Sequence, residues 1–182
     1  KHIKFAARYQ LLANIFEGKA VKGLAITVPA TRGKMGGTGY YTFSAKPSDL
    51  MKIAYVGHKN SKGPESIETY QRMLKTKRLK DIADYINNGG KFPTNIVINL
   101  QYDKKLPFTK KERIGELTFG ELQLPSCYAS AWVIDGQHRL YGYALSDHAH
   151  DSVVPILAFV NLDPTSQKKL FVDINHKQVK VP

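Results

Sequence analysis

Hydrophobic and polar residues are arranged along this chain in patterns that predict both helices and strands. Apolar residues recur at helical spacing over residues 5–16, and over 66–87, where they include Leu79, Ile82, Ala83 and Ile86. Short apolar runs predict strands over residues 24–28, 40–43, 96–100, 132–134 and 153–160. A glycine-rich turn over residues 33–39 is expected to join the first two strands as a hairpin.

Capping residues and polar segments mark the remaining elements. Ser48 is expected to cap a short helix that begins at residues 46–50, and Asp163 to cap a last helix with Pro164 as its first residue. Residues 140–146 predict a helix, whereas the polar segment 101–116 predicts an exposed loop. Because strands and helices alternate in the second half, we expect an α/β layered domain.

Charge divides the chain into a basic region and a nearly neutral one. The 182 residues include 27 Lys and Arg against 15 Asp and Glu, a formal net charge of +12. Residues 1–63 carry +9, residues 64–116 carry +4 and residues 117–182 carry −1. We therefore expect a basic N-terminal region, 1–63, that packs on the same domain as a core over 64–182.

This distribution predicts that one surface binds a polyanion. The alternative is a basic surface that serves only solubility. Contacts to a nucleic-acid backbone would be sensitive to salt and would carry little base specificity. The candidate side chains for DNA phosphate contacts are Lys19, Lys22, Arg32, Lys34, Lys59, Lys75, Lys77 and Arg78.

Composition excludes several classes of protein. The longest apolar run, residues 153–160, is interrupted by Pro155 and is too short to span a bilayer, so no membrane partner is expected. A single cysteine, Cys127, leaves no disulfide framework and no multi-cysteine metal site. The chain begins at Lys1 without an apolar leader, and we expect it to be a fragment of a cytoplasmic protein.

The most specific pattern is Asp135-Gly136-Gln137-His138-Arg139, between an apolar strand and a helix. Gly136 lets a ligand approach closely, and the helix N-terminus attracts anions. Arg139 offers a charged fork to phosphate oxygens, and Asp135 can hold a metal or accept a proton. His138 is the only side chain of the motif whose unperturbed pKa is near neutral. The residues predict a nucleotide-phosphate site, with Asp135 and His138 as candidate catalytic groups. The alternative is structural, with Asp135 capping the helix and Arg139 paired to a carboxylate.

Residues 132–141 resemble the signature of the DGQHR-domain proteins, whose best-known members are DndB-type proteins of bacterial DNA phosphorothioate modification. DpdB-type proteins of 7-deazaguanine DNA modification are related to them. The resemblance covers about residues 66–180 and continues through these landmarks: Tyr70-Gln71-Arg72, residues 92–95, Val154-Pro155, residues 171–175 and Gln178.

The pattern is also similar to a wider set of proteins with the ParB/sulfiredoxin fold, which implies a mixed sheet flanked by helices. Gly136 and Arg139 match the G-x-x-R pattern with which ParB proteins bind CTP phosphates. Gln137 replaces the cysteine of sulfiredoxins, which excludes sulfur-transfer redox chemistry at this position. A similar D-G-Q-Q-R motif in restriction proteins is linked to nucleotide hydrolysis. The resemblance thus implies ATP or another NTP with Mg²⁺, with Asp135 at the metal.

Further residues are candidates for the same nucleotide site. Gln71 and Arg72 precede a basic helix face and could reach a phosphate, although such a face can also be merely solvated. The amides of Asn175 and Gln178 can read a base or ribose, although Asn175 can equally end the last helix. Gly136, Gln137, His138 and Arg139 would hold the phosphates.

The resemblance implies a DNA-binding regulatory or accessory protein of a DNA-modification and defence system. Its expected partners are DNA and the modification proteins of the same system, and the oligomeric state is left open. One alternative is an NTPase whose hydrolysis is coupled to DNA, which predicts turnover that Asp135→Ala or Arg139→Ala abolishes. A ParB-like nuclease ranks last, because the sequence offers no two-metal carboxylate cluster.

Overall fold

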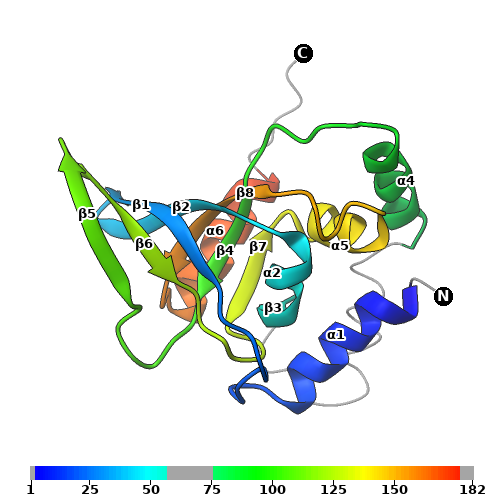
Figure 1. The fold of residues 1–182 in the computed structure, drawn as a ribbon, viewed down its shortest axis with the longest axis horizontal. Coiled ribbons are helices and arrows are strands. Elements are labelled where there is room, and N and C mark those ends of the chain that lie inside the picture. Colours follow the sequence, from blue (N-terminus) through cyan, green and yellow to red (C-terminus); the bar gives the residue numbers. More distant parts are fainter. Residues whose placement is uncertain (1–2, 57–75, 177–182) are drawn as a thin grey trace.

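The computed structural model describes residues 3–56 and 76–176, in which a mixed sheet is flanked by helices (Figure 1). The described strands pair in the order β3-β7-β4-β8-β2-β1-β6-β5. Their bounds are β1 (Thr27–Met35), β2 (Thr38–Ala45), β3 (Ala54–Tyr55), β4 (Ile96–Leu100), β5 (Phe108–Ile114), β6 (Leu117–Gln123), β7 (Ala131–Asp135) and β8 (Val154–Val160).

Strand β4 lies between β7 and β8, and its residues are all buried. It runs parallel to β8 and antiparallel to β7, while β3 and β7 are parallel and the other pairs are antiparallel. The side chain of Asn99 on β4 is also buried, and it bonds the backbone of Leu162 through both its amide nitrogen and its oxygen. Burial on both faces explains why the other four residues of this strand are apolar.

The described helices cover both faces of these central strands. They are α1 (Ile3–Ile15), α2 (Pro47–Ile53), α4 (Thr76–Asn87), α5 (Gln137–Leu145) and α6 (Pro164–His176). The larger core includes Leu50 of α2, Leu79 of α4 and Leu140 of α5, packed with Val133 of β7. Helix α6 packs on a second core that contains Ile134, the next residue of β7. Adjacent strand residues point to opposite faces, so the two cores lie on opposite sides of the sheet.

Strands β1, β6 and β5 form a β arm that extends away from the helices at one end of the molecule (Figure 1). Strand β5 is the last strand of the sheet on this side, and its residues are exposed beyond Phe108. Helix α4 lies at the opposite end of the molecule. Within the described segments, no helix combines the length and the apolarity needed to cross a membrane.

Several predicted elements are confirmed. The expected strand over residues 96–100 has the bounds of β4, and the expected helix over 5–16 corresponds to α1. The cap of the last helix is also confirmed, because Asp163 Oδ1 accepts hydrogen bonds from the backbone N–H groups of Thr165 and Ser166 at 2.9 and 3.0 Å. Residues 66–75 of the expected second helix lie outside the described residues, and its remainder is α4.

Other predictions were wrong. Ser48 does not cap α2, because the N-cap is Lys46, without a side-chain cap, and Pro47 provides the first turn. Segment 101–116 is not a loop throughout, because residues 108–114 form β5. The first hairpin is longer than predicted: β1 runs through Met35, and the turn is confined to Gly36 and Gly37, whose φ values are 54° and 80°. Positive φ at both positions suits glycine and closes a two-residue hairpin turn.

Candidate functional site

The segment from Asp135 to Arg139 forms the turn between β7 and α5. Strand β7 ends at Asp135, Gly136 is the N-cap, and α5 begins at Gln137. Gly136 has φ 87° and ψ 13°, in the left-handed region that glycine adopts readily. A Cβ atom here would lie 3.2 Å from the Cα atom of Ile96 on the neighbouring β4. Glycine is therefore suited to this position for two reasons: it adopts the positive φ of the turn, and it lets the backbone of the turn lie close to β4.

The N-terminus of α5 has the geometry expected of an anion site. In the described part of the chain, no side chain caps this helix. The first helical hydrogen bond runs from the backbone N–H of Leu140 to the Gly136 carbonyl at 2.9 Å. Gly136 is buried and residues 137–139 are half-buried, so the turn is recessed below the surface. A recessed helix N-terminus is electrostatically favourable for a bound anion.

The guanidinium of Arg139 is held by protein groups on two sides. Its Nη2 lies 2.9 Å from Asp135 Oδ2, and its Nη1 donates to the Thr94 carbonyl at 2.6 Å and to the Thr94 hydroxyl. Only 15% of the Arg139 side chain and 29% of the Asp135 side chain are exposed. Arg139 thus links the start of α5 to the end of β7 and to the segment that precedes β4. This ion pair confirms one part of the structural interpretation of the motif. The other part was wrong, because the N-cap is Gly136 and Asp135 does not cap the helix. The nucleotide role stays a prediction.

Two half-buried side chains near the turn carry polar atoms without a hydrogen-bond partner among the described residues. They are Gln137, whose Oε1 is buried, and Trp132, whose Nε1 is buried. A buried polar atom that lacks a partner costs about 1–3 kcal/mol. The Gln137 oxygen lies in the first turn of α5, so a donor bound at this turn would recover that cost. His138 is half-buried in the same helical turn.

Of the remaining predicted nucleotide-binding residues, the structure describes only Asn175. Gln71, Arg72 and Gln178 lie outside the described residues. Asn175 was expected just beyond the end of the last helix, but α6 continues through His176 and Asn175 lies in its final turn. Helix α6 packs on the face of the sheet that carries Ile134. Helix α6, which carries Asn175, is therefore linked to the turn at 135–139 through its packing on strand β7, which ends at Asp135.

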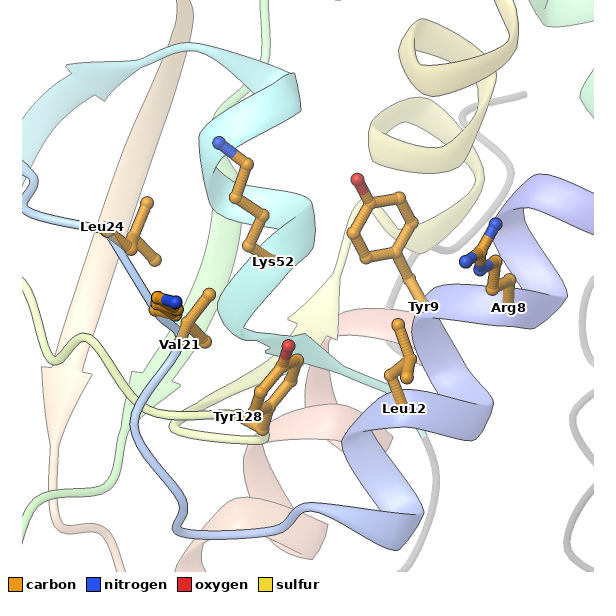
Figure 2. A pocket seen from close by; sticks show the side chains of 9 residues that line it. Arg8, Tyr9, Leu12, Val21, Leu24, Lys52 and Tyr128 are labelled. Atoms are coloured by element: carbon orange, nitrogen blue, oxygen red, sulfur yellow. The ribbon is translucent and has the colours of Figure 1, made fainter.

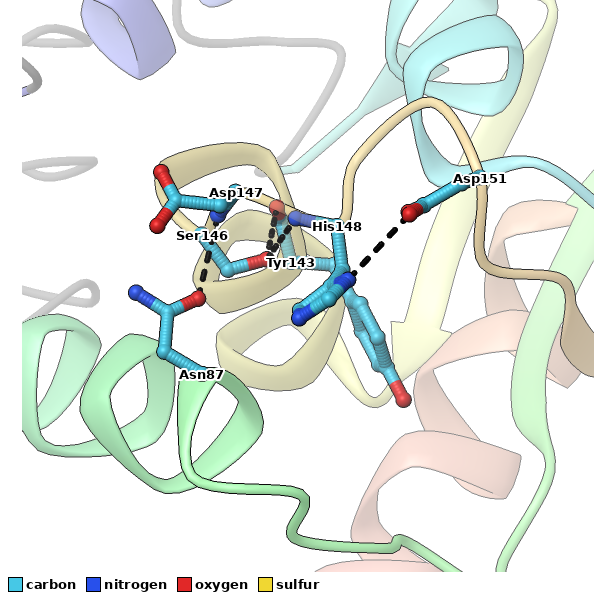
Figure 3. A network of polar contacts seen from close by, with 6 residues as sticks. All are labelled: Asn87, Tyr143, Ser146, Asp147, His148 and Asp151. Carbon is cyan, nitrogen blue, oxygen red and sulfur yellow. Dashed lines mark hydrogen bonds and ion pairs between the residues drawn. The ribbon is translucent and has the colours of Figure 1, made fainter.

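The C-terminal end of α5 is closed by a polar network with no metal-binding character (Figure 3). The Asp147 backbone N–H donates to Asn87 Oδ1 of α4 at 3.0 Å, and the Ser146 hydroxyl donates to the Tyr143 carbonyl at 2.8 Å. His148 Nδ1 lies 3.3 Å from Asp151 Oδ2, and this hydrogen bond holds the pKa of Asp151 below its usual value of 3.8. The described residues contain no group of three or more His, Cys, Asp or Glu side chains that could hold a metal ion. A Mg²⁺ ion at Asp135 would therefore take its other ligands from water or from a bound phosphate.

The predicted DNA-binding residues fall in separate parts of the structure. Lys19 and Lys22 follow α1, Arg32 and Lys34 lie on β1, and Lys77 and Arg78 begin α4. All six side chains are exposed, whereas Lys59 and Lys75 lie outside the described residues. The structure brings Arg32 and Lys34 together on the β arm, but α4 lies at the other end of the molecule (Figure 1).

The β arm also brings in basic residues that the sequence reading missed. In the strand register Thr118 of β6 pairs with Arg32 of β1 on one side and with Arg113 of β5 on the other. Gly120, two residues along β6, pairs with Lys110. Paired residues share a face of the sheet, as do alternate residues of one strand. The side chains on this face, here named the basic arm face, are Arg32, Lys34, Lys110 and Arg113.

Acidic residues of the arm strands lie on the other face. Glu112 pairs with Phe119, and Glu121 pairs with Thr109, so both alternate with the basic arm face. Lys111 Nζ lies 3.6 Å from Glu121 Oε1, an exposed contact on that acidic side. The Arg32 guanidinium lies 5.2 Å from the centre of the Phe108 ring, a cation–π contact that positions it. Residues 110–113 read Lys-Lys-Glu-Arg, without an alternation of charge, and Lys110 and Arg113 share a face because the register of β5 shifts between Lys110 and Glu112.

Comparison with known proteins identifies the family. No curated protein and no solved structure matches the chain. A family model described as DndB, DNA-sulfur modification-associated, matches residues 28–182, which include the described sheet except Thr27, the first residue of β1, and the turn at 135–139. The chain therefore belongs to the DndB family of proteins associated with DNA-sulfur modification.

Proposed function

We propose that this protein is a DNA-binding regulatory or accessory protein of a DNA-sulfur modification system. Its family supports the association with that system. The single observation that supports DNA binding is the basic arm face, on which basic side chains of β1 and β5 gather while Glu112 of β5 faces the other way. Arg113 Nη2 also lies 3.7 Å from Glu116 Oε2 of the turn after β5, an exposed contact that water and salt weaken. DNA and the modification proteins of the same system are the proposed partners.

The dimensions of the basic arm face suit a phosphate backbone. Arg32 and Lys34 are alternate residues and stand about 7 Å apart along the strand, while β1 and β5 are separated by β6 and lie about 10 Å apart. Duplex DNA carries one charge per about 1.7 Å of its axis, so several phosphates fall within such a patch. Contacts of this kind position DNA without reading its bases. The proposed binding is therefore sensitive to salt and tolerant of sequence.

The turn at 135–139 is proposed as a nucleotide-phosphate site, within a ParB/sulfiredoxin-like fold. One observation favours it: the N-terminus of α5 has no side-chain cap among the described residues. The buried Gln137 Oε1 atom, which has no partner in the same part of the chain, accepts hydrogen bonds and would suit a donor such as a ribose hydroxyl or a base N–H, not a phosphate oxygen. Gly136 and the helix N-terminus would hold the phosphates, Arg139 would neutralise them, and Asp135 would position Mg²⁺ or water. Hydrolysis of the nucleotide coupled to DNA is the alternative activity.

The DNA proposal is tested by titrating a fluorescent duplex over a range of salt concentrations. The double variant Lys110→Gln/Arg113→Gln is compared with Lys168→Gln/Lys169→Gln, which removes the same charge from exposed positions on α6. Loss of two phosphate contacts should reduce the slope of log K against log salt by about 2. The α6 variant should keep the slope of the unmodified protein. Equal slopes for both double variants would refute a role for the basic arm face.

The nucleotide proposal is tested separately by NTP hydrolysis and binding with Mg²⁺, with and without duplex DNA, for the unmodified protein and for Arg139→Ala. Turnover that Arg139→Ala abolishes while DNA binding persists would make the turn catalytic. Nucleotide binding without turnover, lost in Arg139→Ala, would make it a sensor. Absence of both in a folded, DNA-binding protein would leave the turn with its structural role and contradict the proposed nucleotide site.

A further inference from the structure

The β arm carries exposed apolar side chains on the face opposite the basic arm face. They are Met35, Ile114, Leu117 and Phe119, which are 55%, 58%, 37% and 37% exposed and are here named the apolar arm face. Leu117 pairs with Ile114 and alternates with Phe119 along β6. Phe119 pairs with Thr31, which lies four residues before Met35 on β1, so all four side chains share one face. Nine large apolar side chains are exposed among the described residues, and nearly half of them are gathered here.

The layer of side chains that covers this side of the sheet ends at Tyr40 of β2. Tyr40 packs on the second core beneath α6 together with Phe159 of β8. It also pairs with Gly33 of β1, where a Cβ atom would lie 2.7 Å from the Tyr40 ring, so the ring covers the strand there. Beyond this ring the arm extends away from the described helices (Figure 1). The apolar face of a sheet is normally buried against a second layer, which the described helices do not provide for this end of the arm.

The free edge of the arm is poorly suited to pairing with another strand. Strand β5 forms this edge and carries Lys110, Lys111 and Arg113. Its register also shifts between Lys110 and Glu112. Charged side chains and a bulge on an edge strand both oppose the addition of a further strand. A protein that binds the arm is therefore expected on the apolar arm face and not along β5.

The charge around the apolar arm face permits a second copy of the chain to bind there. Although the chain carries +12, the charged side chains on this side of the arm are Lys111, Glu112 and Glu121, one base against two acids. Two copies that meet through this face place their basic arm faces on the outer sides of the pair. Packed sheets lie about 10 Å apart, so these faces are separated by more than the Debye length of about 8 Å. Repulsion between the two copies is therefore largely screened at physiological salt.

The area of this side of the arm is close to what a weak dimer needs. Each side chain on a sheet face occupies about 30 Å² of flat area, and three arm strands provide about ten such positions. Because side chains stand out from the sheet, two copies would bury about 1,000 Å² of accessible surface, the lower limit for a specific interface. An interface of this size predicts micromolar affinity.

A head-to-tail contact would require a receptor for the arm elsewhere on the chain. A pocket lies between α1, α2 and the segment 21–24, and Figure 2 shows Arg8 and Lys52 among the side chains around it. The described residues that line it include a third basic residue, Lys22, and no Asp or Glu. To bury apolar side chains there would remove these charges from water without pairing them, which is costly. A two-fold contact, in which the apolar arm face meets its own copy, avoids this cost.

We propose that two copies of this chain form a two-fold dimer in which their apolar arm faces pack against each other. The second copy supplies the layer that the arm lacks beyond Tyr40. The dimer presents a basic arm face on each outer side, and if these faces bind DNA as proposed above, it can hold two DNA segments. The dimer itself does not depend on the DNA or nucleotide proposals.

The experiment is sedimentation equilibrium of the full chain, without DNA or nucleotide, over micromolar to millimolar concentrations. The unmodified protein should pass from one copy to two. Phe119→Thr and Ile114→Thr should each weaken the dimer about tenfold or more, because both copies lose a buried apolar side chain, while threonine remains suited to a strand. The control Val153→Thr makes the same kind of change at a 62% exposed position just before β8, and it should leave dimerisation unchanged.

Cysteine cross-linking tests which faces of the arm meet. In a Cys127→Ser background, Leu117→Cys should give a covalent dimer with a short bismaleimide, whereas Lys34→Cys on the basic arm face should not. Far-UV circular dichroism and melting curves establish that each variant is folded before it is compared.

Three results would overturn the proposal. A single copy at every concentration would leave the apolar arm face to a different protein. Species larger than two copies would indicate a head-to-tail contact, such as one through the pocket beside α1. A dimer that persists unchanged in Phe119→Thr and Ile114→Thr, or that cross-links through Lys34→Cys and not through Leu117→Cys, would place the interface on another surface.

Discussion

Replacement of Gly136 by alanine perturbs the turn in two ways that can be measured separately. The backbone there has φ 87°, a conformation that costs an L-residue about 1–2 kcal/mol. The added Cβ would lie 3.0 Å from Arg139 Nη2 and 3.2 Å from the Ile96 Cα, and overpacking of this kind costs about 1–3 kcal/mol. Reduced freedom of the unfolded chain offsets about 0.4–1 kcal/mol. The expected loss in the free energy of unfolding is about 2–4 kcal/mol.

Gly89 provides the matched control for this substitution. It follows α4 with φ 81°, and a Cβ there would meet nothing within 4 Å. Gly89→Ala therefore carries the backbone cost alone, about 0.5–1.5 kcal/mol after the same offset. Urea denaturation of both variants, followed by far-UV circular dichroism, should show that Gly136→Ala loses about 1–3 kcal/mol more than Gly89→Ala.

Equal losses in the two variants would refute the inference that Gly136 is required for close approach to β4. A further comparison identifies which neighbour causes the crowding. If the Arg139 side chain absorbs it, Gly136→Ala should cost less in an Arg139→Ala background. If the backbone at Ile96 is the obstacle, the cost should be the same in both backgrounds.

Other predictions test the contacts around the same helix and the last one. Arg139→Lys keeps the charge but cannot keep the contacts to both Thr94 and Asp135, so urea denaturation should show a free energy of unfolding lower by about 1–2 kcal/mol. Amide hydrogen exchange of the segment before β4 should also become faster. In Gly142→Ala the new Cβ would overlap the Ile82 side chain of α4, so we expect the free energy of unfolding to fall by about 1–3 kcal/mol. Most of this loss should disappear when Gly142→Ala is introduced into an Ile82→Ala background. The pKa of Asp163 is lowered from 3.8 by hydrogen bonds from Ser166. A carboxylate with a lowered pKa stabilises the fold above its unfolded-state pKa and loses that effect as pH falls through its folded-state pKa. Asp163→Asn should thus flatten the fall in melting temperature below pH 3.8.

The sequence predicted those parts of the fold whose cause is local. Asp163 and Pro164 cap and begin α6 because the side chain, the ring and the helix end are within a few residues of one another. The run at 96–100 is buried on both faces and is apolar except for Asn99. The wrong assignment of Ser48 has an equally local cause, since Pro47 fits the first helical turn and moves the cap to Lys46.

The parts that could not be predicted depend on partners distant in the chain. Strand β5 carries polar residues on both faces, so no alternation of burial marks it, and it forms because β6 offers a free edge. The gathering of Arg32 with Lys110 and Arg113 depends on the register of two strand pairs. The contact between Arg139 and Thr94 joins residues 45 positions apart. Spacing within the motif predicts that Arg139 can reach Asp135, but not that Thr94 completes its hydrogen bonds.

The geometry of Arg139 bears directly on what the turn can do. One guanidinium now satisfies the carboxylate of Asp135 and two oxygens of Thr94, so a phosphate arriving alone would have to compete with those groups for the same donors. A phosphate that arrives with Mg²⁺ meets a different situation. If the turn binds a nucleotide with Mg²⁺ as proposed, Asp135 would hold the metal and Arg139 Nη2 would be free to contact the phosphate, while Nη1 would stay on Thr94. One internal ion pair would then be exchanged for two contacts to the ligand, with the side chain still held in place. This proposed exchange predicts that nucleotide affinity at the turn depends on Mg²⁺, because without the metal the Asp135 carboxylate retains Arg139 Nη2.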